Sequence, residues 1–433
     1  MIRRLFLSQA LSCLGMFSAA CKVLAMGQDS NDNNYGTSKT CQTTVSEIGG
    51  RTLAELRDFH NRELEEEYIA LWDTGGIDWV YGGFIPRWDE NGNFTTDEKQ
   101  MYYMGRGLWV FSYIYNHFGQ RERHLKASRL CRDFILNYCR EKSTGYWISK
   151  ISRDGKTVIE GPYDIYGDMY VILGFTEYYK ATGETNLLDI AIETAHGINE
   201  RIVSPEYQHL QAHKEGYEPG TKILGTWQHF LSALTPLARV TQDYGVEMMA
   251  RMCVRNIMER HFCQEYGVFF EYLDDSFMPY RPEAGRDLRN ISSWHSIQSA
   301  WMCMDEALRL GNQKMFMEAL EMGRLTFEKC WREGEDGGLI GLDYPEQNIA
   351  DSSDSPSWGR LDDAMVFALL AIEHTQAPWA IYWFDKIFTH AYKKPELFSR
   401  TGLLHHPRRL FCCIEILDRM IERNGKVSDF LAG

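Results

Sequence analysis

The sequence predicts an all-α protein in which six helical hairpins close into an α/α barrel (an α/α toroid), with short β-hairpins on one rim. Two observations support this prediction. Twelve segments have the apolar spacing of amphipathic helices, and short glycine-aromatic strings separate pairs of them about every 60 to 70 residues. Helix pairs that each bury one face against their neighbours form either an open solenoid or a closed ring. Six pairs favour the ring, and the open solenoid remains the alternative.

The expected helices follow one another along the whole chain after a polar beginning. Their apolar residues recur at the spacing that places them on one helical face. The twelve segments are residues 53–71, 105–118, 122–139, 167–181, 187–202, 227–241, 246–263, 293–310, 314–331, 361–375, 380–391 and 408–421.

Four glycine-aromatic strings predict the β-hairpins, because each is bounded by residues that favour tight turns. They begin at Gly82, Gly145, Gly267 and Gly337, and the first three are followed by the turn sequences DENGN, SRDGK and LDDSF. We expect these hairpins to link one helix pair to the next.

The first 50 residues have a different character from the rest. Residues 1–26 combine an early basic pair with an apolar run and small residues, which is typical of an export signal. Arg3-Arg4 resembles a twin-arginine signal, and Cys21 after Ser18-Ala19-Ala20 resembles a lipoprotein cleavage site. Residues 27–50 are polar and predict a tether, so residues 51–433 form the expected single catalytic domain. The expected location is outside the cytoplasm, either periplasmic or held to a membrane as a lipoprotein.

Composition excludes several classes of protein. A chain of 433 residues with 44% hydrophobic content is not a disordered protein or a small disulfide-stapled module. The net charge of −14 argues against nucleic-acid binding, because a phosphate backbone repels an acidic surface. No apolar stretch after the signal is long enough for a membrane helix. No CxxC, HxH or HExxH spacing occurs, so we expect neither a metal nor any other cofactor.

The aromatic content suggests the kind of ligand. The chain has 12 Trp, 23 Tyr and 22 Phe, which is more than a core of this size needs. Flat apolar rings around a pocket suit sugars, so we expect a mono- or disaccharide substrate. The sequence leaves open whether the protein is a monomer or a homodimer.

Four short segments place titratable residues beside aromatic ones at helix ends or inside apolar helices. Arg106 follows Tyr102 and Tyr103, where it could clamp a hydroxyl-rich ligand, although a surface arginine is the alternative interpretation. His229 lies in an apolar helical stretch beside Trp227 and Gln228, and a buried structural histidine is the alternative there.

The third segment holds His295. Serines at 292 and 293 predict a helix N-terminus, which places His295 in the first turn and Gln298 one turn later on the same face. The helix dipole at that end favours a neutral histidine, which can accept a proton. In the fourth segment His405 and His406 precede Pro407, and since adjacent side chains diverge, we expect one to face the pocket and the other to face elsewhere.

Carboxylates offer a second chemistry. A glycosidase needs two carboxyl groups on either side of a sugar bond, and an α/α barrel could hold them. Two of the aspartates, Asp274 and Asp275, fall in a predicted turn, where aspartate commonly serves the turn itself. The available aspartates are Asp164, Asp168, Asp274, Asp275, Asp362 and Asp363.

In their order along the chain, these segments resemble motifs of the N-acylglucosamine 2-epimerase family, which includes cellobiose 2-epimerases and mannose or sulfoquinovose isomerases. The resemblance spans about residues 52–425. The matching pieces are Gly82-Gly83-Phe84, Gly105-Arg106, Tyr166-Gly167-Asp168, His229-Phe230-Leu231, His295-Ser296-Ile297-Gln298, Trp358 with Asp363, and His405-His406-Pro407-Arg408.

This resemblance implies a sugar epimerase or aldose–ketose isomerase with a two-histidine mechanism. One histidine removes the proton next to the carbonyl of the opened sugar, and the other returns it to C2 from the opposite face or to C1. The implied pair is His295 and His405, which should share one pocket with Arg106. The implied substrate-binding residues are Arg106, His229, Gln298, Tyr102, Trp358, Asp363 and Asp168.

The sequence departs from the family pattern at several of these positions. Gln298 stands where the family has a glutamate, so it cannot ionise to raise the basicity of His295. Asp363 is shorter than the family's glutamate, and Gly359 replaces a second tryptophan. Two alternatives therefore remain: a glycoside hydrolase or lyase that uses an aspartate such as Asp168 or Asp363, and a sugar-binding protein with impaired catalysis.

Overall fold

The computed structural model describes residues 44–207, 217–280, 290–334, 337–354, 359–393 and 401–432. The predicted export signal and residues 27–43 of the predicted tether lie outside these residues. Residues 44–50 belong to the fold instead, because Val45 and Ile48 are buried in the core. None of the helices in the described part is long and apolar enough to span a lipid bilayer.

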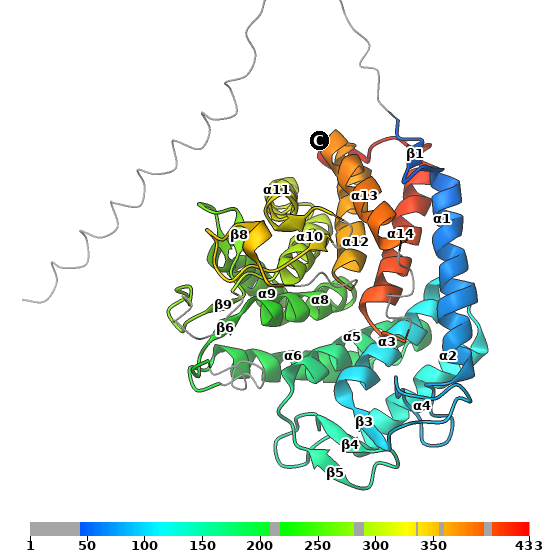
Figure 1. The fold of residues 1–433 in the computed structure, drawn as a ribbon. Helices are drawn as coiled ribbons and strands as arrows, with labels where there is room; N and C mark the ends of the chain where they lie inside the picture. Colours follow the sequence, from blue (N-terminus) through cyan, green and yellow to red (C-terminus); the bar gives the residue numbers. More distant parts are fainter. Residues whose placement is uncertain are drawn as a thin grey trace, which may run out of the picture. The chain divides into compact units, whose positions relative to one another are not determined.

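Six helices form an inner ring, and each packs against the next member around the ring. The ring closes where Phe411 of the last inner helix stacks on Tyr113 of the first, with ring centroids 4.7 Å apart. Figure 1 shows these helices surrounded by a second layer. The inner helices are α3 (Met101–His117), α5 (Ile165–Thr182), α8 (Leu224–Thr241), α10 (Ser293–Leu310), α12 (Gly359–Thr375) and α14 (His405–Glu422).

The outer layer supplies one helix to each inner helix. The first of these is α1 (Leu53–Arg62), which continues through a π-helical segment, Glu63–Ile69, into α2 (Ala70–Thr74) and packs on α14. The other outer helices are α4 (Glu122–Tyr138), α6 (Asn186–Val203), α9 (Tyr244–Arg255) with a π-helical end (Asn256–His261), α11 (Gln313–Cys330) and α13 (Pro378–Ala391). The twelve predicted helices and the six-hairpin α/α barrel are thus confirmed.

Short antiparallel strands lie at the rims of the barrel. Most lie in the connections that run from an outer helix to the next inner helix, which places them on the rim where the inner helices begin. The pairs are β3 (Glu98–Gln100) with β4 (Lys150–Ser152), β4 with β5 (Val158–Glu160), β6 (Lys222–Ile223) with β9 (Tyr272–Leu273), β7 (Phe262–Cys263) with β8 (Val268–Phe269), and β10 (Trp331–Arg332) with β11 (Gly338–Leu339).

Two details differ from the predicted hairpins. The string at Gly82 makes only isolated bridges, Ile77 to Phe84 and Trp88 to Phe94, in place of a strand pair. A further pair, β1 (Glu47–Ile48) with β2 (Arg51–Thr52), precedes an outer helix and therefore lies at the other rim. Short 3₁₀ turns at Ile349–Asp351 and Asp429–Leu431 complete the described structure.

Local sequence sets where the inner helices begin. The Asp164 carboxylate caps α5 by accepting the Tyr166 N–H, and the Ser292 hydroxyl caps α10 by accepting the His295 N–H. Close packing of α3 on α5 depends on Gly105, because a Cβ there would lie 2.5 Å from the carbonyl carbon of Tyr170. This contact brings Arg106, the next residue of α3, against Tyr170.

A buried arginine ties the last inner helix to the first outer helix. The guanidinium of Arg409 is fully buried and donates to Glu63 at 2.6 Å, to Asp362 at 2.8 Å and to the Tyr392 hydroxyl at 2.8 Å. These partners lie in the π-helical segment after α1, in α12, and just after α13. Loss of one partner would leave a buried charge, so this cluster holds the beginning and the end of the ring together.

Candidate active site

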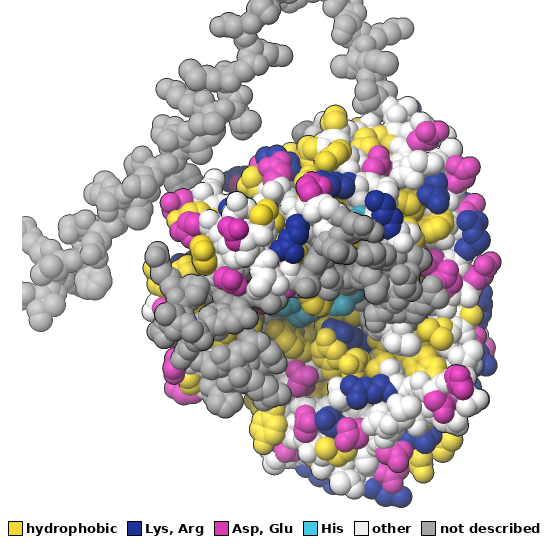
Figure 2. All heavy atoms as spheres, viewed as in Figure 1, with side chains coloured by type: hydrophobic (Ala, Val, Ile, Leu, Met, Phe, Trp, Pro, Cys, Tyr) yellow, Lys and Arg dark blue, Asp and Glu magenta, His cyan; other side chains and the backbone are white. Residues whose placement is uncertain are grey.

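The predicted site residues come together at the rim where the inner helices begin. Tyr102 and Arg106 lie in the first turns of α3, His229 in α8, His295 and Gln298 in α10, and His405 at the first position of α14. Figure 2 shows a hollow on one face of the molecule in which hydrophobic and histidine side chains gather.

His295 is held by a buried carboxylate. Its Nδ1 lies 2.8 Å from Oε2 of Glu271, which directly precedes strand β9, while 23% of the His295 side chain stays accessible. The other oxygen of Glu271 accepts the Gly225 N–H at 3.3 Å. Gly225 makes room for this pair, because a Cβ there would lie 3.0 Å from Cε1 of His295.

Glu271 fixes the proton on His295. Burial raises the pKa of Glu271, but His295, the Gly225 N–H and His261 together outweigh it, and the pKa of this carboxyl falls below its usual value. An ionised carboxylate accepts only, so Nδ1 carries the hydrogen and Nε2 presents its lone pair. This partner corrects the expectation from Gln298, since His295 does have a carboxylate, supplied by a residue that the motif search did not single out.

We predict that Glu271→Gln lowers kcat about 100-fold with little change in KM, because His295 loses the group that sets its tautomer and orientation. Steady-state kinetics with the preferred substrate measures this. Glu160→Gln, on strand β5 away from the histidines, is the control and should retain normal kcat. A purely structural role for Glu271 would instead lower the unfolding temperature and leave kcat per folded molecule unchanged.

His405 has an equivalent partner on another helix. Its Nδ1 lies 2.9 Å from Oδ2 of Asp363, and 19% of its side chain stays accessible. Asp363 also accepts from Arg408 Nη2 at 2.6 Å and from Trp301 Nε1 at 3.1 Å. Burial would raise the pKa of Asp363, but Arg408 and His405 outweigh it, so the pKa lies far below its usual value and the carboxylate stays ionised.

The imidazole of His405 is neutral at rest. Burial lowers its pKa below the ordinary histidine value, although Asp363 opposes that effect. A lone pair on Nδ1 would face the carboxylate, so the proton resides on Nδ1 and Nε2 is the acceptor. The neighbouring His406 turns away into the Arg409 cluster and packs against Tyr68, as predicted for two adjacent histidines.

Gln298 belongs to the His405 side of the site. It is fully buried, donates to Asp363 Oδ2 at 2.7 Å and accepts from Gln228 Nε2 at 2.8 Å. Its Nε2 also lies 2.9 Å from Nδ1 of His405. The amide therefore holds Asp363 in place, and Gln228 is a second residue of this network whose role the motif search did not identify.

A third group contains the predicted arginine. The Arg106 guanidinium lies between two aromatic rings, 3.6 Å from the Tyr102 centroid and 4.2 Å from the Tyr170 centroid. It donates to the Tyr170 hydroxyl at 2.5 Å, and this hydroxyl lies 3.2 Å from Nδ1 of His229. Burial, followed by the nearby His295 and Arg106, lowers the pKa of His229 well below the ordinary value, so this histidine is neutral.

Trp294 joins the groups into one site. Its ring lies against both catalytic candidates, with centroids 5.3 Å from His295 and 4.7 Å from His405, and His229 lies 6.0 Å from His295. Two buried N–H groups here, Nε1 of Trp294 and Nε of Arg106, have no acceptor among the described residues. Both donors are thus left unsatisfied within the described part of the protein.

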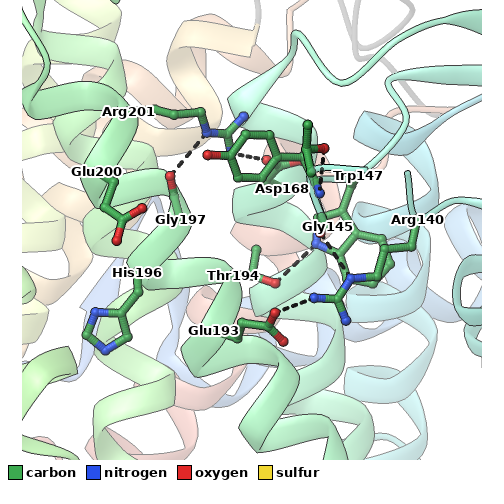
Figure 3. A pocket seen from close by; sticks show the side chains of 12 residues that line it. Arg140, Gly145, Trp147, Asp168, Glu193, Thr194, His196, Gly197, Glu200 and Arg201 are labelled. Carbon is green, nitrogen blue, oxygen red and sulfur yellow. Dashed lines mark hydrogen bonds and ion pairs between the residues drawn. The ribbon is translucent and has the colours of Figure 1, made fainter. Parts of the chain in front are cut away.

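Two predicted residues are not part of this group. Asp168 is buried on the face of α5 that meets α6, where Arg201 holds its carboxylate (Figure 3). It lines a separate pocket of about 260 Å³ together with Tyr146 and Glu200. Trp358 lies outside the described residues.

We predict that acid weakens the hairpin that carries Glu271. His261 is fully buried, its Nδ1 bonds to the Phe270 carbonyl at 2.7 Å, and its Nε2 has no partner among the described side chains. Burial lowers its pKa from 6.5 to about 4. The folded protein therefore binds fewer protons than the unfolded chain, so stability is full above pH 6.5 and falls as pH drops toward 4, by about 3 kcal/mol.

Urea unfolding at pH 7.0, 5.5 and 4.0 measures this loss. His261→Gln keeps a donor to Phe270 but cannot become charged, so its free energy of unfolding should change less over the same range. His196→Gln, on the outer helix α6, is the matched control and should keep the wild-type pH dependence. Equal pH dependence in His261→Gln and the wild type would contradict the prediction.

Among the described residues, no group of three or more His, Cys, Asp or Glu side chains is placed to hold a metal ion. The site consists instead of two histidines, each bonded to a buried carboxylate, with an arginine between aromatic rings. It is a site for proton transfer at the mouth of an α/α barrel.

Comparison with known proteins defines the family. The profile of N-acylglucosamine 2-epimerase (GlcNAc 2-epimerase) matches residues 82–393, so the chain belongs to the N-acylglucosamine 2-epimerase family. The N-acylglucosamine 2-epimerase of Mus musculus is 23% identical over 401 residues, which cover 84% of this chain and 93% of the mouse protein. The cellobiose 2-epimerase of Dictyoglomus turgidum is 25% identical over 286 residues, or 59% of this chain and 70% of that protein.

The fold is shared with solved structures of the same group. The cellobiose 2-epimerase of Spirochaeta thermophila superimposes with a TM-score of 0.69 at 17% identity, covering 85% of this chain and 98% of the other. At that identity the likeness establishes the α/α barrel, and the chemistry must be argued from the residues of this chain.

Proposed function

We propose that the protein is a sugar isomerase that interconverts a free reducing mono- or disaccharide with its C2 epimer or with the corresponding ketose. Family membership supports the class of reaction. The observation that carries the proposal is the pair of histidines at one rim, each with Nδ1 bonded to a buried carboxylate and Nε2 left for a substrate.

The reaction follows from this arrangement. In the open-chain sugar, Nε2 of one histidine takes the proton from C2, and the electrons of the C–H bond form an enediolate with its charge on the former carbonyl oxygen. In this proposal Arg106 and the N–H of Trp294, whose buried donors lack partners among the described residues, donate to that oxygen. The other histidine, in its protonated form, gives a proton to the opposite face of C2, which yields the epimer. If the proton of the C2 hydroxyl first moves to O1, so that the charge lies on O2, donation of the proton to C1 yields the ketose instead.

Each carboxylate supports its histidine through this cycle. An imidazolium is stabilised when its Nδ1–H points at an ionised carboxylate, so Glu271 and Asp363 lower the cost of the charge that appears on His295 or His405. The neutral resting state of His405 suits a proton acceptor in one direction of the reaction. In the reverse direction its conjugate acid is a strong donor.

Neither alternative from the sequence gains support. Asp168 is engaged by Arg201 outside the histidine site, and Asp363 is bound by four donors, His405 among them, that keep it ionised, so neither is placed as a general acid for glycoside cleavage. The case for impaired catalysis rested on Gln298, and Glu271 provides the carboxylate that Gln298 cannot.

The test is exchange at C2. The protein is incubated in deuterated water with mannose, glucose, N-acetylglucosamine or cellobiose, and deuterium at C2 is followed by NMR. We expect uptake with at least one of these sugars, together with a new epimer or ketose. Absence of uptake with all four would contradict the proposal.

We also propose that residues 1–26 direct export and that the mature protein resides in the periplasm, free or held at Cys21. The basic pair and the apolar run of the sequence support this. Cell fractionation of the full chain, of Arg3→Lys with Arg4→Lys, and of Cys21→Ala tests it. The double lysine variant should remain in the cytoplasm, and retention of the wild type there would contradict export.

A further inference from the structure

A pocket of about 190 Å³ opens where the inner helices approach their C-terminal ends, away from the rim that carries the histidines. Three aromatic side chains form one wall of it: Trp109 and Tyr113 from α3 and Phe411 from α14. The exposed surface of the pocket is mainly apolar. Its volume is comparable to cavities that hold a single aromatic ring.

Arg408 connects this pocket to the candidate active site. The residue lines the pocket and is 6% exposed, and its Nη2 donates to Asp363, the partner of His405. Its Nε–H is buried and has no acceptor among the described residues. A buried donor without an acceptor costs free energy, so a ligand that supplies an acceptor there would be favoured.

The opposite wall offers an acceptor. Pro236 lies inside α8 and has no N–H to give to the carbonyl of Ser232 four residues earlier, and both residues line the pocket. The pocket thus has Arg408 and Ser232 on either side of an apolar interior, and the Ser232 carbonyl lacks its usual N–H partner four residues later.

The charges near the opening are already paired. Lys180 lies 2.8 Å from Glu177, and Arg239 lies 2.6 Å from Asp305. These pairs give the entrance little net charge. Hydrogen bonding to Arg408 and Ser232, rather than charge at the entrance, would therefore select the ligand.

We propose that this pocket is a second ligand site for a small planar ring that carries a carboxamide or carboxylic acid, and that its ligand acts on the sugar site through Arg408. The ring fits the aromatic wall, and the acceptor oxygen meets Nε of Arg408. Because Arg408 bonds to Asp363, a shift of its guanidinium moves the carboxylate that is bonded to Nδ1 of His405.

Binding is tested on the full chain with three probes of one size: benzamide, benzoic acid and benzylamine. Titration followed by ligand-observed NMR should show benzamide binding most tightly and benzylamine, which has no acceptor, most weakly. Ser232→Trp and Cys412→Trp fill the pocket from opposite walls and should abolish benzamide binding. Val240→Trp, on the same helix as Ser232 but outside the pocket, is the matched control and should bind normally.

Two results would contradict the proposal of a second ligand site. One is the failure of benzamide to bind at millimolar concentration, and the other is binding that survives both filling substitutions. These measurements need no turnover, so they stand even if the protein fails to isomerise the sugars named above.

The link to the sugar site has its own measurement. Coupling between two sites is reciprocal, so a saturating sugar should change the Kd of benzamide by about fivefold or more, and benzamide should change the Kd of the sugar by the same factor. Calorimetric titrations in both orders measure the two factors. Identical Kd values with and without the partner ligand would contradict the action through Arg408.

Discussion

His295→Gln should lower the rate of sugar interconversion by about 10²- to 10⁴-fold, the range expected when a positioned acid–base group is lost. Glutamine keeps a similar size and can still bond to Glu271, so the fold should be retained. The same loss is expected for His405→Gln. NMR integration of both sugar species over time gives the rates.

The two variants should differ in deuterium exchange. If the histidines work from opposite faces of C2, each single variant keeps the base for one epimer and loses the base for the other. His295→Gln should then exchange the C2 proton of one epimer, and His405→Gln that of the other, while neither interconverts them. Loss of exchange for the same epimer in both variants would contradict a two-base mechanism.

His196→Gln is the control for both variants. This histidine lies on α6 in the separate pocket with Asp168, so its rate and exchange should match the wild type. A large loss in His196→Gln would show that the assay responds to general damage to the protein.

Asp363→Asn should have the second-largest effect, because it alters both stability and catalysis. The asparagine cannot balance the buried charge of Arg408 and no longer offers two anionic oxygens to Trp301 and His405. Loss of one partner of a buried ion pair typically costs about 3 to 5 kcal/mol. Misplacement of His405 should lower kcat about 100-fold.

The adjacent residue gives a matched control. Asp362 is also buried and pairs with Arg409 at 2.8 Å, but it does not contact His405. Asp362→Asn should therefore lose stability to a similar degree, as measured by urea unfolding, while kcat per folded molecule stays near the wild-type value. Equal loss of kcat in both variants would reduce Asp363 to a structural role.

Sequence periodicity was sufficient to predict the barrel, because each helix has its own apolar face and each helix pair must bury these faces against the neighbouring pairs. The ends of the helices were less predictable. Helix α14 begins at His405 rather than at Arg408, with Pro407 tolerated in the first turn, where its missing N–H has no helical partner to lose.

The residues nearest the chemistry could be predicted where a motif marked them, as for His295, His405 and Arg106. Asp363, the partner of His405, was among the predicted site residues, but the partner of His295 was harder to identify, because Glu271 reaches it from a hairpin 24 residues earlier. One signal was available: an acidic residue directly after a glycine-aromatic hairpin, in GVFFE. Contacts between residues of different inner helices depend on the directions of their side chains across the ring. The spacing of residues along one helix does not give these directions.

The first described residues pair with the chain just after the last inner helix. Thr44 forms a β-bridge with Lys426, and the Val45 N–H donates to the Gly425 carbonyl at 2.9 Å. A ring joined in this way has no end unit that must be capped against water, in contrast to an open solenoid. The gene could therefore be circularly permuted: a short linker from residue 432 to residue 44, with new termini in an exposed connection, should leave every helix with its present neighbours.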